Sequence, residues 1–240
     1  MARATTLAVA AFLAAAFNGS AASAEGWSGS LAVTSDYIVR GITRSDGDPS
    51  LQGDLHRDFA QGWFAGLSAA TVRLGPDEPI SAEADAYAGY RQDLGGGFHG
   101  SLTATHYDYP GSDSGDQYRY DEVAAAIAWR NRLRLSASVL PDTSIESRYG
   151  KANGRPAYAA DIAIHQPVRA GWSFNAGLGY YDLQQLIGVG YPYWNGGIAY
   201  DCGSAQIDLS YIGSSATAKS LYYDERAGNR WAATLVWQFF

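Results

Sequence analysis

His99 and Ser101 have the residue types of a nucleophilic pair, and their spacing places both side chains on one face of a strand. In a hydrolase that acts on lipid, such a pair would cleave an ester bond. This pair directly follows a short polar connection, however, and no third group is placed to orient the histidine. We therefore predict no catalytic residues and no enzyme activity. His56, His106 and His165 lack the spacing of metal ligands, so neither a metal site nor another cofactor is predicted.

Charged side chains occupy alternate positions in several segments of the chain. Glu83, Asp85 and Arg91 alternate with alanine and tyrosine, and this period of two is typical of a strand with one polar and one apolar face. If the apolar faces meet lipid, the polar faces must line a lumen, because a basic charge near the bilayer midplane costs about 2–4 kcal/mol. The side chains predicted to line this lumen are Asp36, Arg40, Asp54, His56, Glu83, Asp85, Arg91, Glu122, Arg134, Asp161 and Asp208.

Hairpins are the elements that position these side chains. Short polar connections recur near residues 61, 96, 131, 168 and 202, at steps of 34 to 37 residues, with longer loops between them. Short periplasmic turns that alternate with long outer loops are typical of outer-membrane barrels. We predict one all-β domain, a transmembrane antiparallel up-and-down barrel. Its twelve strands are predicted at residues 27–41, 50–59, 63–72, 80–92, 98–109, 117–129, 133–140, 157–165, 172–181, 191–200, 204–212 and 229–240.

Aromatic residues gather at the predicted strand ends. Rings of this kind form girdles at both membrane boundaries of a barrel. The aromatic last strand also predicts recognition by the barrel-assembly machinery and insertion among outer-membrane lipids. The periplasmic girdle is predicted to contain Trp27, Trp63, Trp129, Trp172 and Trp237, and the opposite girdle Tyr37, Tyr107, Tyr118, Tyr193, Trp194, Tyr211, Tyr222 and Trp231.

The first 24 residues have the pattern of a signal peptide. Arg3 precedes an apolar run at residues 7–17, and Ala22, Ser23 and Ala24 form a small-residue cleavage site. The run is too short to cross a bilayer as a helix, which takes about 20 residues. We predict export, cleavage after Ala24, and a barrel formed by residues 25–240 in the cell outer membrane.

The charge balance and the cysteine count argue against other classes. The chain has 17 Lys and Arg against 24 Asp and Glu, a formal net charge of −7, which disfavours a nucleic-acid partner. Cys202 is the single cysteine and lies far from the predicted cleavage site, so neither an internal disulfide nor a lipoprotein anchor is expected.

Residues 34–53 resemble the opening of the TorF family of bacterial outer-membrane porins. The short turn followed by residues 62–66 and the acidic segment with Glu83 and Asp85 are also similar, and the resemblance extends over essentially the whole mature chain. It implies an outer-membrane barrel with a channel function, and it brings no established substrate and no catalytic residues. The matching positions at the start are Thr34, Ser35, Asp36, Tyr37, Arg40, Gly41, Pro49, Gln52 and Gly53.

These patterns predict a porin through which small hydrophilic solutes or ions diffuse passively. The lumen is expected to prefer cations weakly, because carboxylates outnumber arginines on its wall. A twelve-stranded lumen lies between filled eight-stranded barrels and open channels of 16–18 strands. The charges could equally pair across a plugged interior. The alternatives to a channel are a non-conducting barrel that acts through its extracellular loops, by adhesion or partner binding, and, less favoured, an outer-membrane lipid hydrolase.

Overall fold

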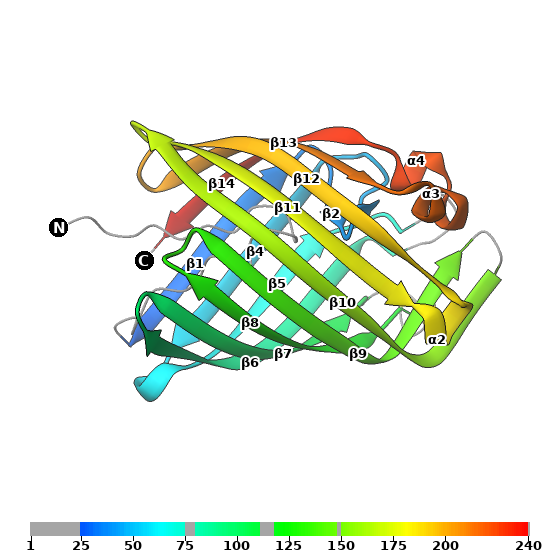
Figure 1. Cartoon of the computed structure of the whole chain (residues 1–240), viewed down its shortest axis with the longest axis horizontal. Coiled ribbons are helices and arrows are strands. Elements are labelled where there is room, and N and C mark those ends of the chain that lie inside the picture. Colours follow the sequence, from blue (N-terminus) through cyan, green and yellow to red (C-terminus); the bar gives the residue numbers. More distant parts are fainter. Residues whose placement is uncertain (1–24, 75–79, 111–117, 148–149, 240) are drawn as a thin grey trace.

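The computed structural model describes residues 25–74, 80–110, 118–147 and 150–239 of the 240-residue chain. The predicted signal peptide and the terminal Phe240 lie outside these residues. Twelve strands form one closed antiparallel barrel, as predicted (Figure 1). They are β1 (Gly26–Thr34), β4 (Ser50–Asp58), β5 (Trp63–Thr71), β6 (Ala82–Gly95), β7 (Phe98–Asp108), β8 (Tyr120–Trp129), β9 (Leu133–Ser147), β10 (Gly150–Arg169), β11 (Trp172–Leu183), β12 (Val189–Asp201), β13 (Ala205–Ser214) and β14 (Arg230–Phe239).

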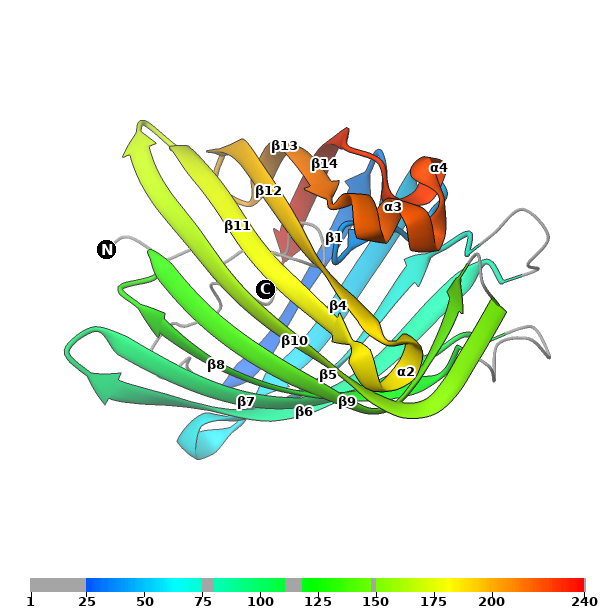
Figure 2. The ribbon, with the colours of Figure 1, turned by 45° about the vertical axis from the view of Figure 1, so that its right-hand side comes forward.

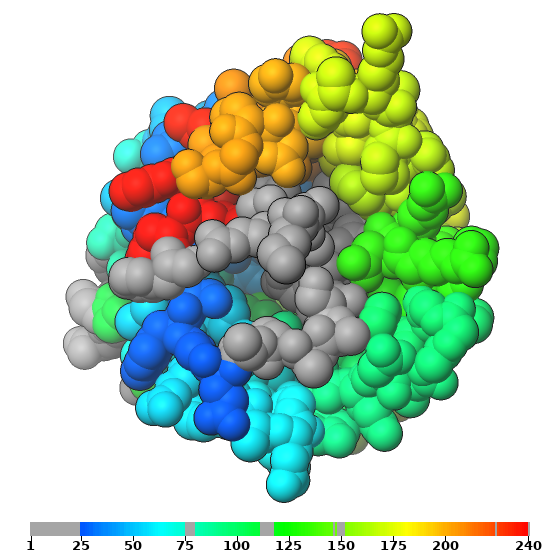
Figure 3. Space-filling model, turned by 90° about the vertical axis from the view of Figure 1, so that its left-hand side faces the viewer, coloured from blue at the N-terminus to red at the C-terminus, as the bar shows by residue number. Residues whose placement is uncertain are grey.

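The barrel closes between its first and last strands. Consecutive barrel strands pair with each other from β1 and β4 through to β13 and β14. The barrel is then closed by pairing of β14 with β1. The register at the seam sets Leu31 opposite Trp237 and Thr34 opposite Thr234. Figure 3 views one end of the molecule, where the colours pass around the ring from blue through green and yellow to orange and red.

The two ends of the barrel differ. The five short connections lie at one end, which we call the turn end, together with the start of β1 and the end of β14 (Figure 1). Tight turns there use positive φ, as at Asn131 (53°) and Gly171 (85°), so the turn predicted near residue 168 lies two or three residues later. The opposite end, which we call the loop end, carries α2 (Gln184–Ile187), α3 (Ala216–Tyr222) and α4 (Asp224–Ala227) (Figure 2). None of the helices among the described residues is long and apolar enough to cross a membrane.

Side chains alternate between the two faces of the wall as predicted. On β8, Val123, Ile127 and Trp129 are exposed on the outer face, whereas Ala128 is buried inside. Arg57 lies on the outer face of β4, where its guanidinium packs over the ring of Trp27. The tryptophans predicted for the periplasmic girdle are all exposed at strand ends next to short turns or chain ends; these are Trp27, Trp63, Trp129, Trp172 and Trp237.

The first predicted strand is too long. The barrel strand ends at Thr34 instead of residue 41, and the segment that follows forms a separate two-stranded hairpin of β2 (Ile38–Val39) and β3 (Ile42–Thr43). Its turn contains Arg40 and Gly41, both with positive φ, which a continuous strand cannot include. Asp36 and Arg40 therefore do not lie on a barrel strand, contrary to the prediction.

Two of the strands predicted to be shortest are the longest. β9 has 15 residues and β10 has 20, and the two remain paired where residues 141–156 were predicted to form a loop. Register shifts on either side of Arg155 accommodate the breaks in pairing. The inward-facing Leu140, Ile145 and Ala157 are buried in the core at the loop end, and this packing keeps the segment extended.

The second predicted aromatic girdle is largely wrong. Trp231 and Tyr211 are exposed on the outer face, but Tyr37 and Tyr193 are only 7% and 1% exposed because they point into the barrel. With Tyr109, Tyr191, Leu183 and the helices, they form a buried core that fills the loop end. Aromatic rings at these strand ends therefore pack against one another inside the barrel.

The outward register can be tested on β7. Leu102 lies near the middle of this strand and is 54% exposed on the outer face. In lipid vesicles, Leu102→Arg should lower the free energy of unfolding by about 2–4 kcal/mol, since the charge enters the hydrocarbon. Leu94→Arg, at the turn end, should cost about 0–1 kcal/mol. Equal costs in urea unfolding would contradict the assigned register.

Candidate functional site

Residues 35–49, between β1 and β4, fold into the barrel, and we call this segment the inner hairpin. At its tip, a Cβ on Gly41 would lie 2.8 Å from the Cβ of Ser214 and 3.0 Å from that of Tyr193. These residues belong to β13 and β12, so the tip packs closely against that side of the wall. The positive φ of 77° at Gly41 adds a second reason why the tip requires glycine.

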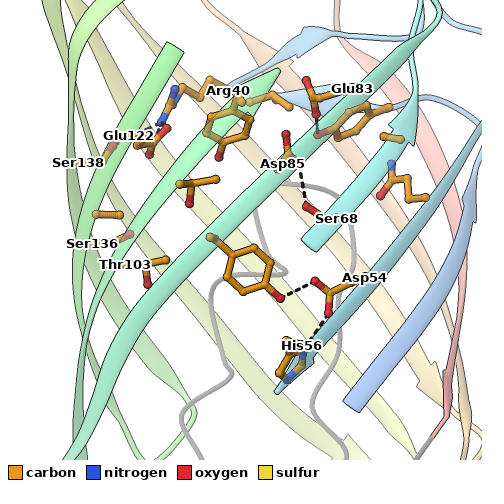
Figure 4. A pocket seen from close by; sticks show the side chains of 18 of the residues that line it. Arg40, Asp54, His56, Ser68, Glu83, Asp85, Thr103, Glu122, Ser136 and Ser138 are labelled. Atoms are coloured by element: carbon orange, nitrogen blue, oxygen red, sulfur yellow. Dashed lines mark hydrogen bonds and ion pairs between the residues drawn. The ribbon is translucent and has the colours of Figure 1, made fainter. Parts of the chain in front are cut away.

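Arg40 connects the inner hairpin to the other side of the wall. Its Nη2 lies 2.8 Å from both carboxylate oxygens of Glu122 on β8 and 3.4 Å from the hydroxyl of Ser138 on β9 (Figure 4). The guanidinium also lies 4.7 Å from the ring centroid of Tyr181. Both side chains of the ion pair are 13% exposed, so solvent screens this contact weakly.

Glu83 on β6 holds a second set of contacts. Its two oxygens accept hydrogen bonds from the hydroxyls of Tyr37 and Tyr109, each at 2.7 Å. Arg44 lies 3.6 Å from the same carboxylate and donates to the Tyr109 hydroxyl at 2.6 Å. Glu83 is 1% exposed, and its charge is balanced by one guanidinium and two hydroxyl donors. A carboxylate on the wall therefore fixes both the start and the end of the inner hairpin.

Asp36 organises the inner hairpin itself. Its Oδ1 accepts hydrogen bonds from the hydroxyls of Thr43 and, at 3.0 Å, Ser45, and its Oδ2 accepts one from Arg230 on β14 at 2.9 Å. The carboxylate is thus satisfied by the hairpin and the adjacent strand. Asp36 stabilises the segment and does not face the space below it.

α3 and α4 cover the inner hairpin at the loop end. Ala218 and Leu221 of α3 are buried in the apolar core, and Arg226 of α4 donates to the carbonyl oxygen of Thr43 at 3.4 Å. Burial, and to a smaller extent the nearby Arg44 guanidinium, lower the pKa of Arg226. The loop end is therefore filled by three layers: wall, hairpin and helices.

Below the inner hairpin, toward the turn end, the lumen contains a cavity of about 400 Å³ (Figure 4). Most of the residues that line it on β4 to β9 have polar side chains. On β4 and β6, Asp54 accepts hydrogen bonds from Tyr87 at 2.5 Å and contacts His56 at 2.8 Å. Asp85 accepts one from Ser68 at 2.8 Å. Polar groups from both the wall and the inner hairpin therefore surround the cavity.

Most of the predicted lumen residues meet in this cavity. Two do not: Asp36 is buried in the hairpin contacts, and Asp208 is buried on β13, where it bonds to Ser210 at 2.6 Å. Arg91 also pairs with Asp58, at 2.5 Å. The nine that line the cavity are Arg40, Asp54, His56, Glu83, Asp85, Arg91, Glu122, Arg134 and Asp161.

Sequence reasoning missed the neutral part of the lining and one of its arginines. Arg44 lies in a predicted connection between two strands, so it was not predicted to line the lumen. The hydroxyl residues of β7 and β9 were not predicted because the lumen residues were chosen by charge. The alternation of hydroxyl and apolar residues could have identified them. Ser101, Thr103 and Thr105 alternate with Leu102 and Ala104 in the same way as the charged residues alternate with apolar ones on other strands. The hydroxyl residues that line the cavity include Ser101, Thr103, Thr105, Ser136 and Ser138.

The nucleophilic pair does not assemble. Ser101 lines the cavity, and no hydrogen bond joins it to His99 in the part of the chain that the structure describes. In the same ranges no group of three or more His, Cys, Asp or Glu side chains is placed to hold a metal ion.

Residues 18–239 match the model of a family described as a bacterial protein of unknown function (Gcw_chp). The chain belongs to this family. Comparison with curated proteins finds no match. The resemblance of this Gcw_chp chain to the TorF family stays a prediction.

Several solved barrels are similar in fold to this Gcw_chp protein. The KdgM porin superposes with a TM-score of 0.53 at 10% identity over 89% of this chain and 99% of KdgM. The NanC porin gives 0.54 at 9% identity over 90% and 99% of the two chains. An outer membrane channel from Pseudomonas putida F1 gives 0.53 at 11% identity over 92% and 97%. These similarities show the fold.

The contact between Arg40 and Glu122 should keep the inner hairpin ordered. In Arg40→Ala, Glu122 keeps a poorly solvated charge without its partner, so amide exchange in residues 35–49 should accelerate about ten-fold or more. Hydrogen exchange with mass spectrometry measures this directly. Arg57→Ala, on the outer face, should leave the exchange of residues 35–49 unchanged. Equal protection in both variants would show that Arg40 does not hold the hairpin.

Proposed function

We propose that this protein is an outer-membrane channel for the passive diffusion of small hydrophilic solutes or ions, with the inner hairpin as its constriction. The observation that carries the proposal is the polar cavity of about 400 Å³ beneath the hairpin of a closed barrel. A barrel interior that served stability alone would be packed with side chains. Hydroxyl, carboxylate and guanidinium groups around an open volume are instead typical of a solute pathway.

The structural neighbours support this proposal, since they include porins and a channel. KdgM has been solved in complex with disordered oligogalacturonate. For the present protein we propose a weak preference for cations. Its cavity holds Asp54 and Asp85, whose hydrogen bonds among the described residues come from imidazole and hydroxyl groups rather than from arginine.

We further propose the cell outer membrane as the location, with the turn end facing the periplasm. Residues 1–24 would act as the signal peptide, with cleavage after Ala24, and the aromatic β14 would be recognised by the barrel-assembly machinery. The exposed tryptophans at the turn end would lie at the membrane boundary among outer-membrane lipids. No catalytic step is part of the proposed function.

One observation favours a second candidate. The loop end is filled by the inner hairpin, α3, α4 and an aromatic core, and the paired ends of β9 and β10 project beyond the barrel there (Figure 2). A barrel plugged in this way could act by binding a partner at its loop end without conducting. The two candidates differ in whether the hairpin opens a path.

Single-channel currents in planar bilayers test the channel directly. The wild-type protein should give small discrete steps, and a salt gradient should produce a reversal potential of cation sign. The double variant Arg40→Ala/Glu122→Gln should give steps several-fold larger, because it removes the contact that holds the hairpin across the lumen without leaving a lone charge.

The matched control is Arg57→Ala, which removes a guanidinium from the outer face and should conduct like the wild type. Folding of each protein is checked by heat-modifiable migration on gels. Silence from the wild type and the double variant, both folded and inserted, would refute the channel and favour a function at the loop end.

A further inference from the structure

One wall of the cavity combines small and hydroxyl side chains. On β8, Ala124 pairs with Thr103 of β7 and with Ser138 of β9. One step toward the turn end, Ala126 likewise pairs with a hydroxyl residue on each side. The short alanine side chains leave room between two rows of hydroxyls that point into the cavity (Figure 4). The hydroxyl positions are Ser101 and Thr103 on β7 and Ser136 and Ser138 on β9.

Most of these hydroxyls are available to a ligand. Among the described residues, the side chains of Ser101, Thr103 and Ser136 make no hydrogen bond within the protein, and Ser138 receives only a long one, 3.4 Å, from Arg40. A hydroxyl can both donate and accept, so this wall suits a solute with several hydroxyl groups.

The neighbouring wall adds a charged acceptor and a neutral donor without partners. Asp85 Oδ2 accepts a hydrogen bond from Ser68, but Asp85 Oδ1 has no partner although it is hidden from solvent. Gln52 Nε2 on β4 is also hidden and unpartnered. Both residues line the cavity. If these side chains turn toward the cavity, a charged donor on a ligand would pair with the Asp85 carboxylate, and a neutral acceptor would pair with the Gln52 amide.

No arginine among the described residues forms an ion pair with Asp85. Arg40 pairs with Glu122, and Arg44 lies against Glu83. A third guanidinium, that of Arg91, contacts Asp58 below the cavity. The charge of Asp85 therefore attracts a cation into this part of the lumen and repels an anion.

From these groups we infer that the cavity binds a small polyhydroxylated amine of the amino-sugar class. The ammonium group lies on Asp85, and the hydroxyl groups contact Gln52 and the wall of β7 to β9. The volume of about 400 Å³ is at the lower end of the range of about 300–1,000 Å³ for small-molecule pockets, which suits one or two sugar rings. This inference rests on the proposed channel, since it names the solute class that the pathway favours.

Three probes on one scaffold test the charge preference. Glucosamine, glucose and glucuronate share a pyranose ring. Relative to neutral glucose, glucosamine has an ammonium in place of the C2 hydroxyl, and glucuronate has a carboxylate in place of the C6 hydroxymethyl group. Isothermal titration calorimetry of the folded protein in detergent should give binding of glucosamine, about ten-fold weaker binding of glucose, and none of glucuronate. Equal affinity for the three probes, or a preference for glucuronate, would overturn the inference.

Variants test the residues. Asp85→Asn should weaken glucosamine binding about ten-fold and change glucose binding little, because it removes the charge and keeps the shape. Thr103→Val should weaken both sugars about three-fold, because it removes one hydroxyl. Asp121→Asn alters an exposed carboxylate outside the cavity and should bind like the wild type. Undiminished glucosamine binding by folded Asp85→Asn would show that the ammonium does not lie there.

The same proteins separate this inference from the channel itself. If the protein gives discrete current steps that glucosamine does not block, and calorimetry detects no binding, the channel is supported and the amino-sugar site is refuted. Binding that depends on Asp85 in a protein that never conducts supports the site and refutes passage. Block by glucosamine that is lost in Asp85→Asn supports both.

Discussion

Closure of the sheet between β1 and β14 is the constraint on which the rest of the structure depends. An open strand edge in lipid would leave backbone N–H and C=O groups without partners, at several kcal/mol each. Once the seam is closed, each strand must send alternate side chains into two environments. At the seam this places Val33 and Leu235 outside, whereas Thr34 and Thr234 are buried inside and share a hydrogen bond of 2.9 Å.

Closure also determines how charges are arranged in the interior. Carboxylates on the wall such as Glu83 and Glu122 are largely buried, so each is stable only with donors nearby. The inner hairpin supplies many of them, with Arg40 against Glu122 and Arg44 against Glu83. The hairpin and the acidic wall therefore stabilise each other, and the part of the lumen beyond the reach of the hairpin stays open as the cavity.

The sequence allowed the strand number and the two faces to be predicted because both depend on a local period of two. The acidic face of β6, with Glu83 and Asp85, follows from alternation alone. The inner hairpin could not be found in this way, because the bond that joins Asp36 to Arg230 spans 194 positions. The local sequence also gave a wrong prediction at β9 and β10. The prolines and glycines of residues 141–156 favour a loop, but packing at the loop end keeps these strands paired, with Pro156 at a register shift.

The contacts of the inner hairpin are not equivalent on its two sides. Ile38 packs with Ile212 and Ala232 in an apolar cluster on β13 and β14, and separating them would expose hydrophobic surface to water. On the side of β8 and β9, the hairpin is held by the side chain of Arg40, whose polar contacts water can replace. In the proposed channel, separation of the hairpin from the wall at Arg40 would open a path along the hydroxyl residues of β7 and β9.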